Sequence, residues 1–187
     1  MNHSDQKKTY HIVFIAMMAA IVYVVTLLRF PLLGTKVHFA NAMCLLAGLL
    51  LGPLSGGLAA GLGSAIFDAT AGGYDLIQCL ITFASKFAMA LLCAVLAGNG
   101  AKRTGWRITA ACIAGALSYV VLYMLKTFVY QAFVYGFPMD AVWATMLSKL
   151  PGSLINAVAA AVAAPIFYGV LKPALEKAGI WGRLKDQ

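Results

Sequence analysis

The sequence predicts an all-α integral membrane protein, a single domain of six transmembrane helices over residues 1–187. Three observations support this: apolar residues come in long blocks, 62% of all residues are hydrophobic and only 11% are charged. A soluble domain carries about 25% charged residues. Blocks of about 20 apolar residues are long enough to cross a bilayer as helices. The composition therefore excludes an ordinary soluble domain.

Proline and glycine set the ends of the predicted spans, because proline removes a backbone donor and clashes with the preceding turn. The first span ends at Pro31, the second at Gly52-Pro53 and the third before Gly72-Gly73. The fourth ends at Gly98, and a kink or break is expected in the sixth at Pro151-Gly152. The six predicted spans cover approximately residues 8–30, 38–51, 54–71, 74–98, 106–135 and 139–171.

The distribution of basic residues predicts the orientation. Six spans place both termini on one side, together with nine basic residues: Lys7, Lys8, Lys102, Arg103, Arg107, Lys172, Lys177, Arg183 and Lys185. The opposite side has Arg29 and Lys36, with Asp75 and Asp140. The positive-inside rule then predicts cytoplasmic termini. The net charge of +8 therefore reflects topology, and we expect no nucleic-acid partner.

Four charged residues fall inside the predicted spans, Lys86, Lys126, Lys149 and Asp68. A charge in the hydrocarbon costs about 2.5–3.5 kcal/mol on insertion scales, so such residues usually face a cavity or a partner. All four fall in the half of the membrane away from the termini. They predict a pocket that opens toward the outside.

Other polar side chains share helix faces with these charges, at spacings of three and four residues. The neighbours include Ser64, Thr82, Ser85, Tyr119 and Tyr130. Their donors, acceptors and flat rings suit a small polar heterocycle. The predicted ligand-binding residues are Lys86, Asp68, Asn41, Gln78, His38, Lys126, Tyr123, Lys149 and Asn156.

Simpler interpretations stay open for some of these charges. Lys126 and Lys149 lie near helix ends, where lysine side chains can extend to the lipid headgroups. Asp68 can form a purely structural bridge with a lysine. These interpretations require no ligand.

The sequence has no catalytic or metal-binding motif. It lacks a supported Ser-His-Asp arrangement, an H-E-x-x-H helix and a phosphate-binding loop. Its four cysteines have no metal-ligand spacing and lie in apolar runs, where cysteine acts as a small hydrophobe; they are Cys44, Cys79, Cys93 and Cys112. We therefore expect a protein that is not an enzyme and has no metal or cofactor of its own.

Several different short motifs lie in the first half of the chain. They are the Ala16-x-x-x-Ala20 pair, His38, the turn Gly52-Pro53 with Gly56, the run Gly61-x-Gly63-Ser64-x-x-x-Asp68, and Lys86. Over residues of about 10–100, this pattern resembles the substrate-binding S component of energy-coupling-factor (ECF) vitamin transporters. It is most similar to the riboflavin-type subgroup, which includes hydroxymethylpyrimidine and pyridoxine-like specificities. The remainder matches in the number and size of its spans.

The resemblance implies a six-helix bundle in the bacterial plasma membrane that binds its ligand from outside, under a loop at Pro31–Val37. The implied ligand is a small vitamin or related heterocycle: pyridoxine, hydroxymethylpyrimidine, riboflavin or a deazapurine such as a queuosine precursor. The implied partners are an ECF transmembrane scaffold subunit, which would pack on Ala16 and Ala20, and two ECF ATPases, which would use the ATP. Small side chains allow such close helix packing.

The chain departs from the family pattern after His38. Relatives often have Gly-Asp where this chain has Ala40-Asn41, so a neutral amide replaces a carboxylate. Asp68 is then the one acidic residue of the predicted core, beside three lysines. If all three lysines face the pocket, they favour an anionic or acceptor-rich ligand.

Two other functional classes remain as alternatives. A stand-alone ion-coupled transporter of a small polar metabolite would need titratable groups that reach both faces. The alternative of another class is a membrane enzyme or an assembly factor. No relay of titratable groups is evident in the cytoplasmic half, and the sequence lacks the catalytic carboxylates and histidines that an enzyme would need.

Overall fold

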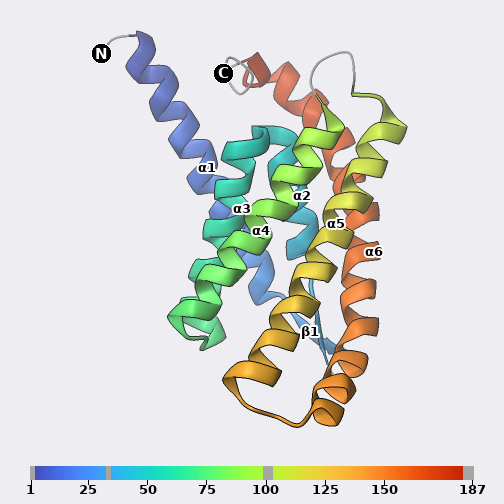
Figure 1. Cartoon of the computed structure of the whole chain (residues 1–187). Helices are drawn as coiled ribbons and strands as arrows, with labels where there is room; N and C mark the ends of the chain where they lie inside the picture. The colour runs from blue at the N-terminus through green and yellow to red at the C-terminus, as the bar shows by residue number, and fades with distance from the viewer. Residues whose placement is uncertain (1–2, 33–34, 99–102, 183–187) are drawn as a thin grey trace.

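The computed structural model describes residues 3–32, 35–98 and 103–182, and its helices form one bundle (Figure 1). Two wider π-helical turns, η1 (Asp68–Gly72) and η3 (Tyr130–Val134), extend the third and fifth helices. The bundle confirms the predicted all-α fold class. Its helices are α1 (His3–Leu27), α2 (Ala40–Leu51), α3 (Pro53–Phe67), α4 (Leu76–Ala97), α5 (Gly105–Val129) and α6 (Met139–Lys177).

Four helical segments are long and apolar enough to cross a membrane, within the part of the chain that the structure describes. They are Thr9–Leu27, Leu76–Ala97, Gly105–Val134 and Met139–Lys177. α2 has 12 residues and α3 has 15, fewer than the roughly 20 that a full crossing needs. The second and third predicted spans are therefore shorter helices, joined at a tight turn.

α2 is the core of the bundle. Eleven of its residues are buried, and it packs against each of the other five helices. A helix that is apolar on all sides belongs in an interior. Gly48 allows the close approach, because a side chain there would collide with the backbone of Ala90 on α4. The turn to α3 uses Gly52, whose φ of 84° is a left-handed conformation that glycine adopts without strain.

The break predicted in the sixth helix at Pro151-Gly152 is wrong. α6 is continuous from Met139 to Lys177, with Pro151, Pro165 and Pro173 inside it. Membrane helices tolerate proline where neighbouring groups satisfy the freed carbonyls. α6 also packs along α5 and α2.

The segment between α1 and α2 is a short hairpin. β1 (Phe30–Leu32) pairs antiparallel with β2 (Thr35–Val37), with Phe30 opposite Val37. The sequence predicted a loop over Pro31–Val37, of which residues 33–34 lie outside the described residues. β2 lies against α6, and the backbone N–H of His38 donates to Asn156 Oδ1 at 3.0 Å. The hairpin is therefore tied to α6.

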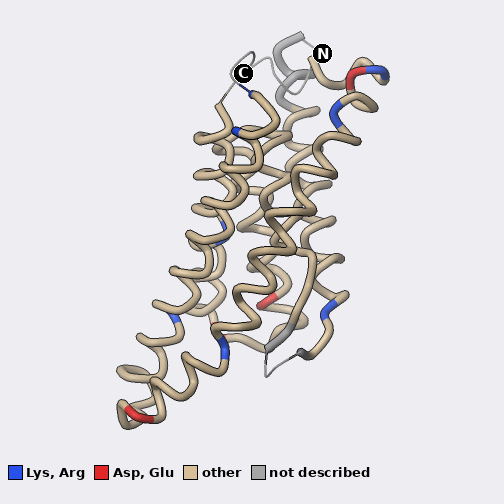
Figure 2. Tube along the Cα trace, turned by 90° about the vertical axis from the view of Figure 1, so that its right-hand side faces the viewer, with Lys and Arg blue, Asp and Glu red and all other residues tan. Residues whose placement is uncertain are grey.

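α1 begins and α6 ends at the same end of the bundle (Figure 1). Lys and Arg lie both at this end and along the other half of the bundle (Figure 2). The Arg103 guanidinium joins three elements here, donating to the carbonyls of Gly98 (2.6 Å) and Leu49 (2.7 Å) and to the Tyr168 hydroxyl (2.9 Å). Of the basic residues that predicted the orientation, Lys102, Arg183 and Lys185 lie outside the described residues.

Candidate functional site

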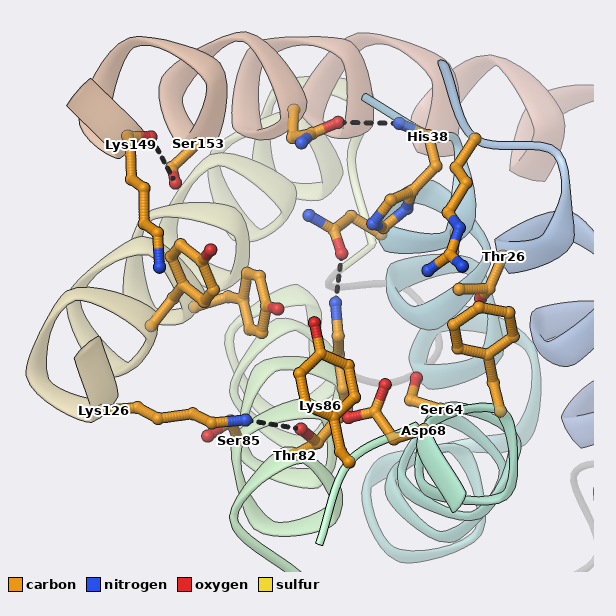
Figure 3. A pocket seen from close by; sticks show the side chains of 18 residues that line it. Thr26, His38, Ser64, Asp68, Thr82, Ser85, Lys86, Lys126, Lys149 and Ser153 are labelled. Atoms are coloured by element: carbon orange, nitrogen blue, oxygen red, sulfur yellow. Dashed lines mark hydrogen bonds between the residues drawn. The ribbon is translucent and has the colours of Figure 1, made fainter. Parts of the chain in front are cut away.

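A cavity of about 280 Å³ lies in the half of the bundle away from the start of α1 and the end of α6. Figure 3 shows it from close by. Chain direction explains its position, since α1 and α3 end there, α2 and α4 begin there, and the α5–α6 connection lies beyond it. All six helices or the residues flanking them contribute to the lining: Thr26, Arg29, His38, Ala40, Asn41, Ser64, Phe67, Asp68, Tyr74, Thr82, Ser85, Lys86, Tyr119, Tyr123, Lys126, Lys149, Ser153 and Asn156.

The structure brings most of the sequence-predicted site residues together. Those that line the cavity are Lys86, Asp68, Asn41, His38, Lys126, Tyr123, Lys149 and Asn156. They come from elements far apart in the chain, so only the folded bundle assembles them. Which of them contact a ligand stays a prediction.

Gln78 is the predicted residue that does not line the cavity. Its Nε2 donates to Asp75 Oδ2 and its backbone N–H donates to Asp75 Oδ1, both at 2.8 Å. Asp75 is the N-cap of α4, and such a cap needs an acceptor for the free N–H groups of the first turn. These hydrogen bonds hold the pKa of the exposed Asp75 carboxyl below its usual value, and the bond from the Gln78 backbone N–H has the largest effect.

Several lining residues were missed. Arg29 was interpreted as a topology signal, because it falls at the end of the first predicted span. Thr26 and Ser153 carry no sequence signal, since single hydroxyls are common in membrane helices. Their hydroxyls donate to the carbonyls of Val22 (2.6 Å) and Lys149 (3.0 Å), which leaves oxygen lone pairs free to accept.

Lys86 is the most deeply buried charge of the site, with 3% of its surface exposed. Its ammonium group donates to Asn41 Oδ1 on α2, and Asn41 is 2% exposed. The same nitrogen lies 3.5 Å from the centre of the Tyr119 ring, a cation–π contact. Tyr119 stacks in turn on Tyr123, with ring centres 6.1 Å apart. Lys86 is thus held by a neutral amide and a ring.

Asp68 opens the π-helical turn η1, directly after α3. It is 9% exposed and close enough to attract Lys86 and Lys126. Within the described residues, its carboxylate oxygens have no hydrogen bond or ion pair of their own. The structural bridge considered for Asp68 is therefore not formed as a direct contact there. Wide helical turns of this kind are frequent at functional sites.

Lys126 and Lys149 enter the cavity from α5 and α6 (Figure 3). Lys126 Nζ lies 3.2 Å from Thr82 Oγ1, which accepts a hydrogen bond, and 5.4 Å from the centre of the Tyr74 ring. In the described part of the chain, the Lys149 ammonium group has no hydrogen-bond partner. Both lysines thus extend into the interior of the site.

His38 adds a neutral polar ring. Burial, and then the charges of Lys86 and Arg29, lower the pKa of His38 to about 3. The imidazole is therefore uncharged near neutral pH, with one nitrogen able to donate and the other able to accept. Its Nδ1 is buried without a hydrogen-bond partner in the described structure. A buried polar atom of this kind usually has a partner, which a ligand or a water can supply.

A bundle of apolar helices around a polar, aromatic-lined cavity is the architecture of a membrane-embedded binding protein. The family model described as "ECF-type riboflavin transporter, S component" matches residues 6–173, and the chain belongs to this family. This confirms the membership predicted from the short motifs. The family is one of transport components, so the chain is a multi-pass membrane protein of transport and not a member of an enzyme family.

A solved chain described as "Structure and mechanism of the S component of a bacterial ECF transporter" has the same fold. The TM-score is 0.70 at 19% sequence identity, over 90% of this chain and 98% of the other. At this identity, the likeness concerns the fold alone. A comparison with curated proteins finds no significant match.

Proposed function

We propose that this chain is the high-affinity substrate-binding subunit of an ECF-type importer in a bacterial plasma membrane. Its substrate is a small water-soluble vitamin or related heterocycle: pyridoxine, hydroxymethylpyrimidine, riboflavin or a deazapurine such as a queuosine precursor. The observation that carries the proposal is the cavity, which combines stacked tyrosines with buried donors and acceptors. Ligand sites typically occupy about 300–1,000 Å³. At about 280 Å³, this one suits a compact ligand.

The polar groups around the cavity support a ring ligand with both donors and acceptors. Asp68 accepts, Lys86 donates, and neutral His38 can do either. The tyrosine pair, Tyr119 and Tyr123, offers flat apolar faces for stacking. The hairpin between α1 and α2 carries Arg29 and His38 at its two ends, so it frames the cavity from the side predicted to face outward.

The proposal includes partners that supply energy. A membrane scaffold subunit would pack against α1, and two ATPases would hydrolyse ATP on the cytoplasmic side, where both termini would lie. On α1, Ala16 and Ala20 are exposed and one turn apart, while Ala19 is buried against α3. Small exposed side chains at this spacing allow a second helix to approach closely.

The test is mass spectrometry of small molecules that co-purify with the full chain in detergent. The wild-type protein and Lys172→Met should retain the same compound, because Lys172 pairs with Glu176 on α6 and does not line the cavity. Lys86→Met should lose it, since removing a charged donor costs roughly ten- to a hundredfold or more in affinity. Thermal unfolding would show that Lys86→Met is still folded.

The proposal is contradicted if no compound is enriched on the wild-type protein. If folded Lys86→Met retains the compound as tightly as wild type does, Lys86 is structural and does not contact the ligand.

A further inference from the structure

The cavity has an excess of positive charge. Arg29, Lys86, Lys126 and Lys149 line it, whereas Asp68 is the one acidic residue among the lining residues. Charges at membrane depth are costly unless they are paired or face water. With four cations and one carboxylate, the lining therefore carries positive charge that its own acidic residue does not neutralise.

The cations differ in how far the protein satisfies them. Lys86 has Asn41 and the Tyr119 ring, and the Arg29 guanidinium lies 4.8 Å from the centre of the Phe67 ring. Asp68 attracts both Lys86 and Lys126. Among the described residues, the Lys149 ammonium group has no ion pair, hydrogen bond or aromatic contact. Lys149 is thus the lining cation that the described residues compensate least.

Lys126 and Lys149 are the two lysines that α5 and α6 contribute to the cavity. Both side chains extend into the cavity (Figure 3). Thr82 accepts a hydrogen bond from Lys126, so its own hydroxyl hydrogen remains available to a second acceptor. A side chain that escaped to the lipid headgroups would not line the cavity. Two ammonium groups and a hydroxyl donor that line the same cavity are donors of the kind that bind an anion.

We propose that the ligand carries an acid group, a carboxylate or a phosphate monoester, which binds between Lys126 and Lys149. The ring of the ligand then lies against Tyr119 and Tyr123, within reach of Lys86 and Asp68. This inference rests on the proposed function and narrows its substrate class to anionic heterocycles. Neutral analogues with the same ring bind more weakly.

The test compares matched neutral and acidic probes on the purified full chain by titration calorimetry. One series is pyridoxine, pyridoxic acid and pyridoxine phosphate, and the other is riboflavin and riboflavin monophosphate. In the series whose ring fits, an acidic member should bind at least about tenfold tighter than its neutral counterpart. The carboxylate and phosphate members distinguish the two acid groups.

Lys149→Met should abolish this preference, while Lys172→Met, on the same helix but outside the cavity, should keep it. Thermal unfolding would show that both variants are folded. The inference is overturned if the neutral member binds as tightly as its acidic partners, or if the preference survives in Lys149→Met. In both cases the proposed function still stands.

The compound recovered by co-purification gives a readout that does not depend on the choice of probes. Retention of that compound on an anion-exchange resin at neutral pH supports the inference. A neutral or cationic compound overturns it and leaves the proposed function intact. Failure to recover any compound counts against the proposed function itself.

Discussion

At the scale of single residues, the Lys86–Asn41 contact joins the site to the core. Lys86 is on α4 and Asn41 is on α2, and both are almost fully buried. When a buried donor loses its acceptor, the protein is destabilised by the full cost of desolvating that donor. Replacing both partners by apolar groups can leave the free energy of unfolding nearly unchanged. The pair is therefore expected to behave as a unit in unfolding experiments.

Asn41→Leu should lower the free energy of unfolding by about 1–3 kcal/mol, because the Lys86 ammonium loses its side-chain acceptor. The double variant Lys86→Met/Asn41→Leu should recover most of this loss. Thermal unfolding in detergent of the wild type, of Asn41→Leu, of Lys86→Met and of the double variant gives a complete double-mutant cycle. A double variant as unstable as Asn41→Leu alone would show that Asn41 acts through packing and not through the hydrogen bond.

The charged residues of the site could be predicted because charges are rare within apolar runs. Helical spacing then identified Asn156 and Tyr123, but it also selected Gln78, whose side chain instead bonds to the N-cap Asp75. Helical spacing alone does not reveal that the N-cap Asp75 competes with the cavity for the Gln78 side chain. Arg29 was missed for a related reason, since a basic residue next to a span end has two explanations that the sequence does not separate.

At the scale of elements, glycine sets how closely the helices pack. Gly63 on α3 lies against α1, where an added Cβ would collide with the carbonyl oxygen of Ala19 and crowd Val22. Gly169 on α6 is exposed, with no heavy atom near the position of an added Cβ. These two helical glycines therefore form a matched pair for substitution.

Gly63→Ala should destabilise the protein by about 1–3 kcal/mol, because the backbones of α1 and α3 must separate. Gly169→Ala should cost nothing and can add up to about 1 kcal/mol from helix propensity. Both changes add one methyl group, so the difference in thermal unfolding isolates the helix contact. Equal stability of the two variants would refute the close packing of α1 on α3.

The helices could be predicted more readily than their depth in the membrane. Long apolar runs identify α4, α5 and α6 to within a few residues at most ends. The short helix α2 is apolar on every side, so it has no polar face that would distinguish an interior helix from a lipid-facing one. The hairpin strands have three residues each, too few for an alternating pattern to emerge.

At the scale of the whole molecule, the two ends of the bundle differ in character. One end has the start of α1, the end of α6 and the Arg103 contacts, and the other has the cavity and the hairpin. The proposed function requires that these ends face opposite sides of the membrane. The orientation itself rests on the positive-inside rule.

Thr35→Cys and Gly105→Cys should react with a membrane-impermeant maleimide from opposite faces, Thr35→Cys from outside intact cells and Gly105→Cys only after lysis. The natural cysteines should give little background, because all four are buried. The wild-type protein and each variant would be labelled in parallel. Labelling of both variants in intact cells would rule out the proposed topology.

The position of α2 has a consequence for the effect of bilayer thickness. A lipid-facing helix must match the hydrocarbon by tilting or by deforming it. α2 spans only about 18 Å and is enclosed by the other five helices, so it has no such constraint. Changes in acyl-chain length therefore act on the surrounding helices and leave Asn41, at one end of α2, in place. Ligand affinity can then stay constant across membranes of different thickness, while any transport step that tilts the outer helices depends on the lipid.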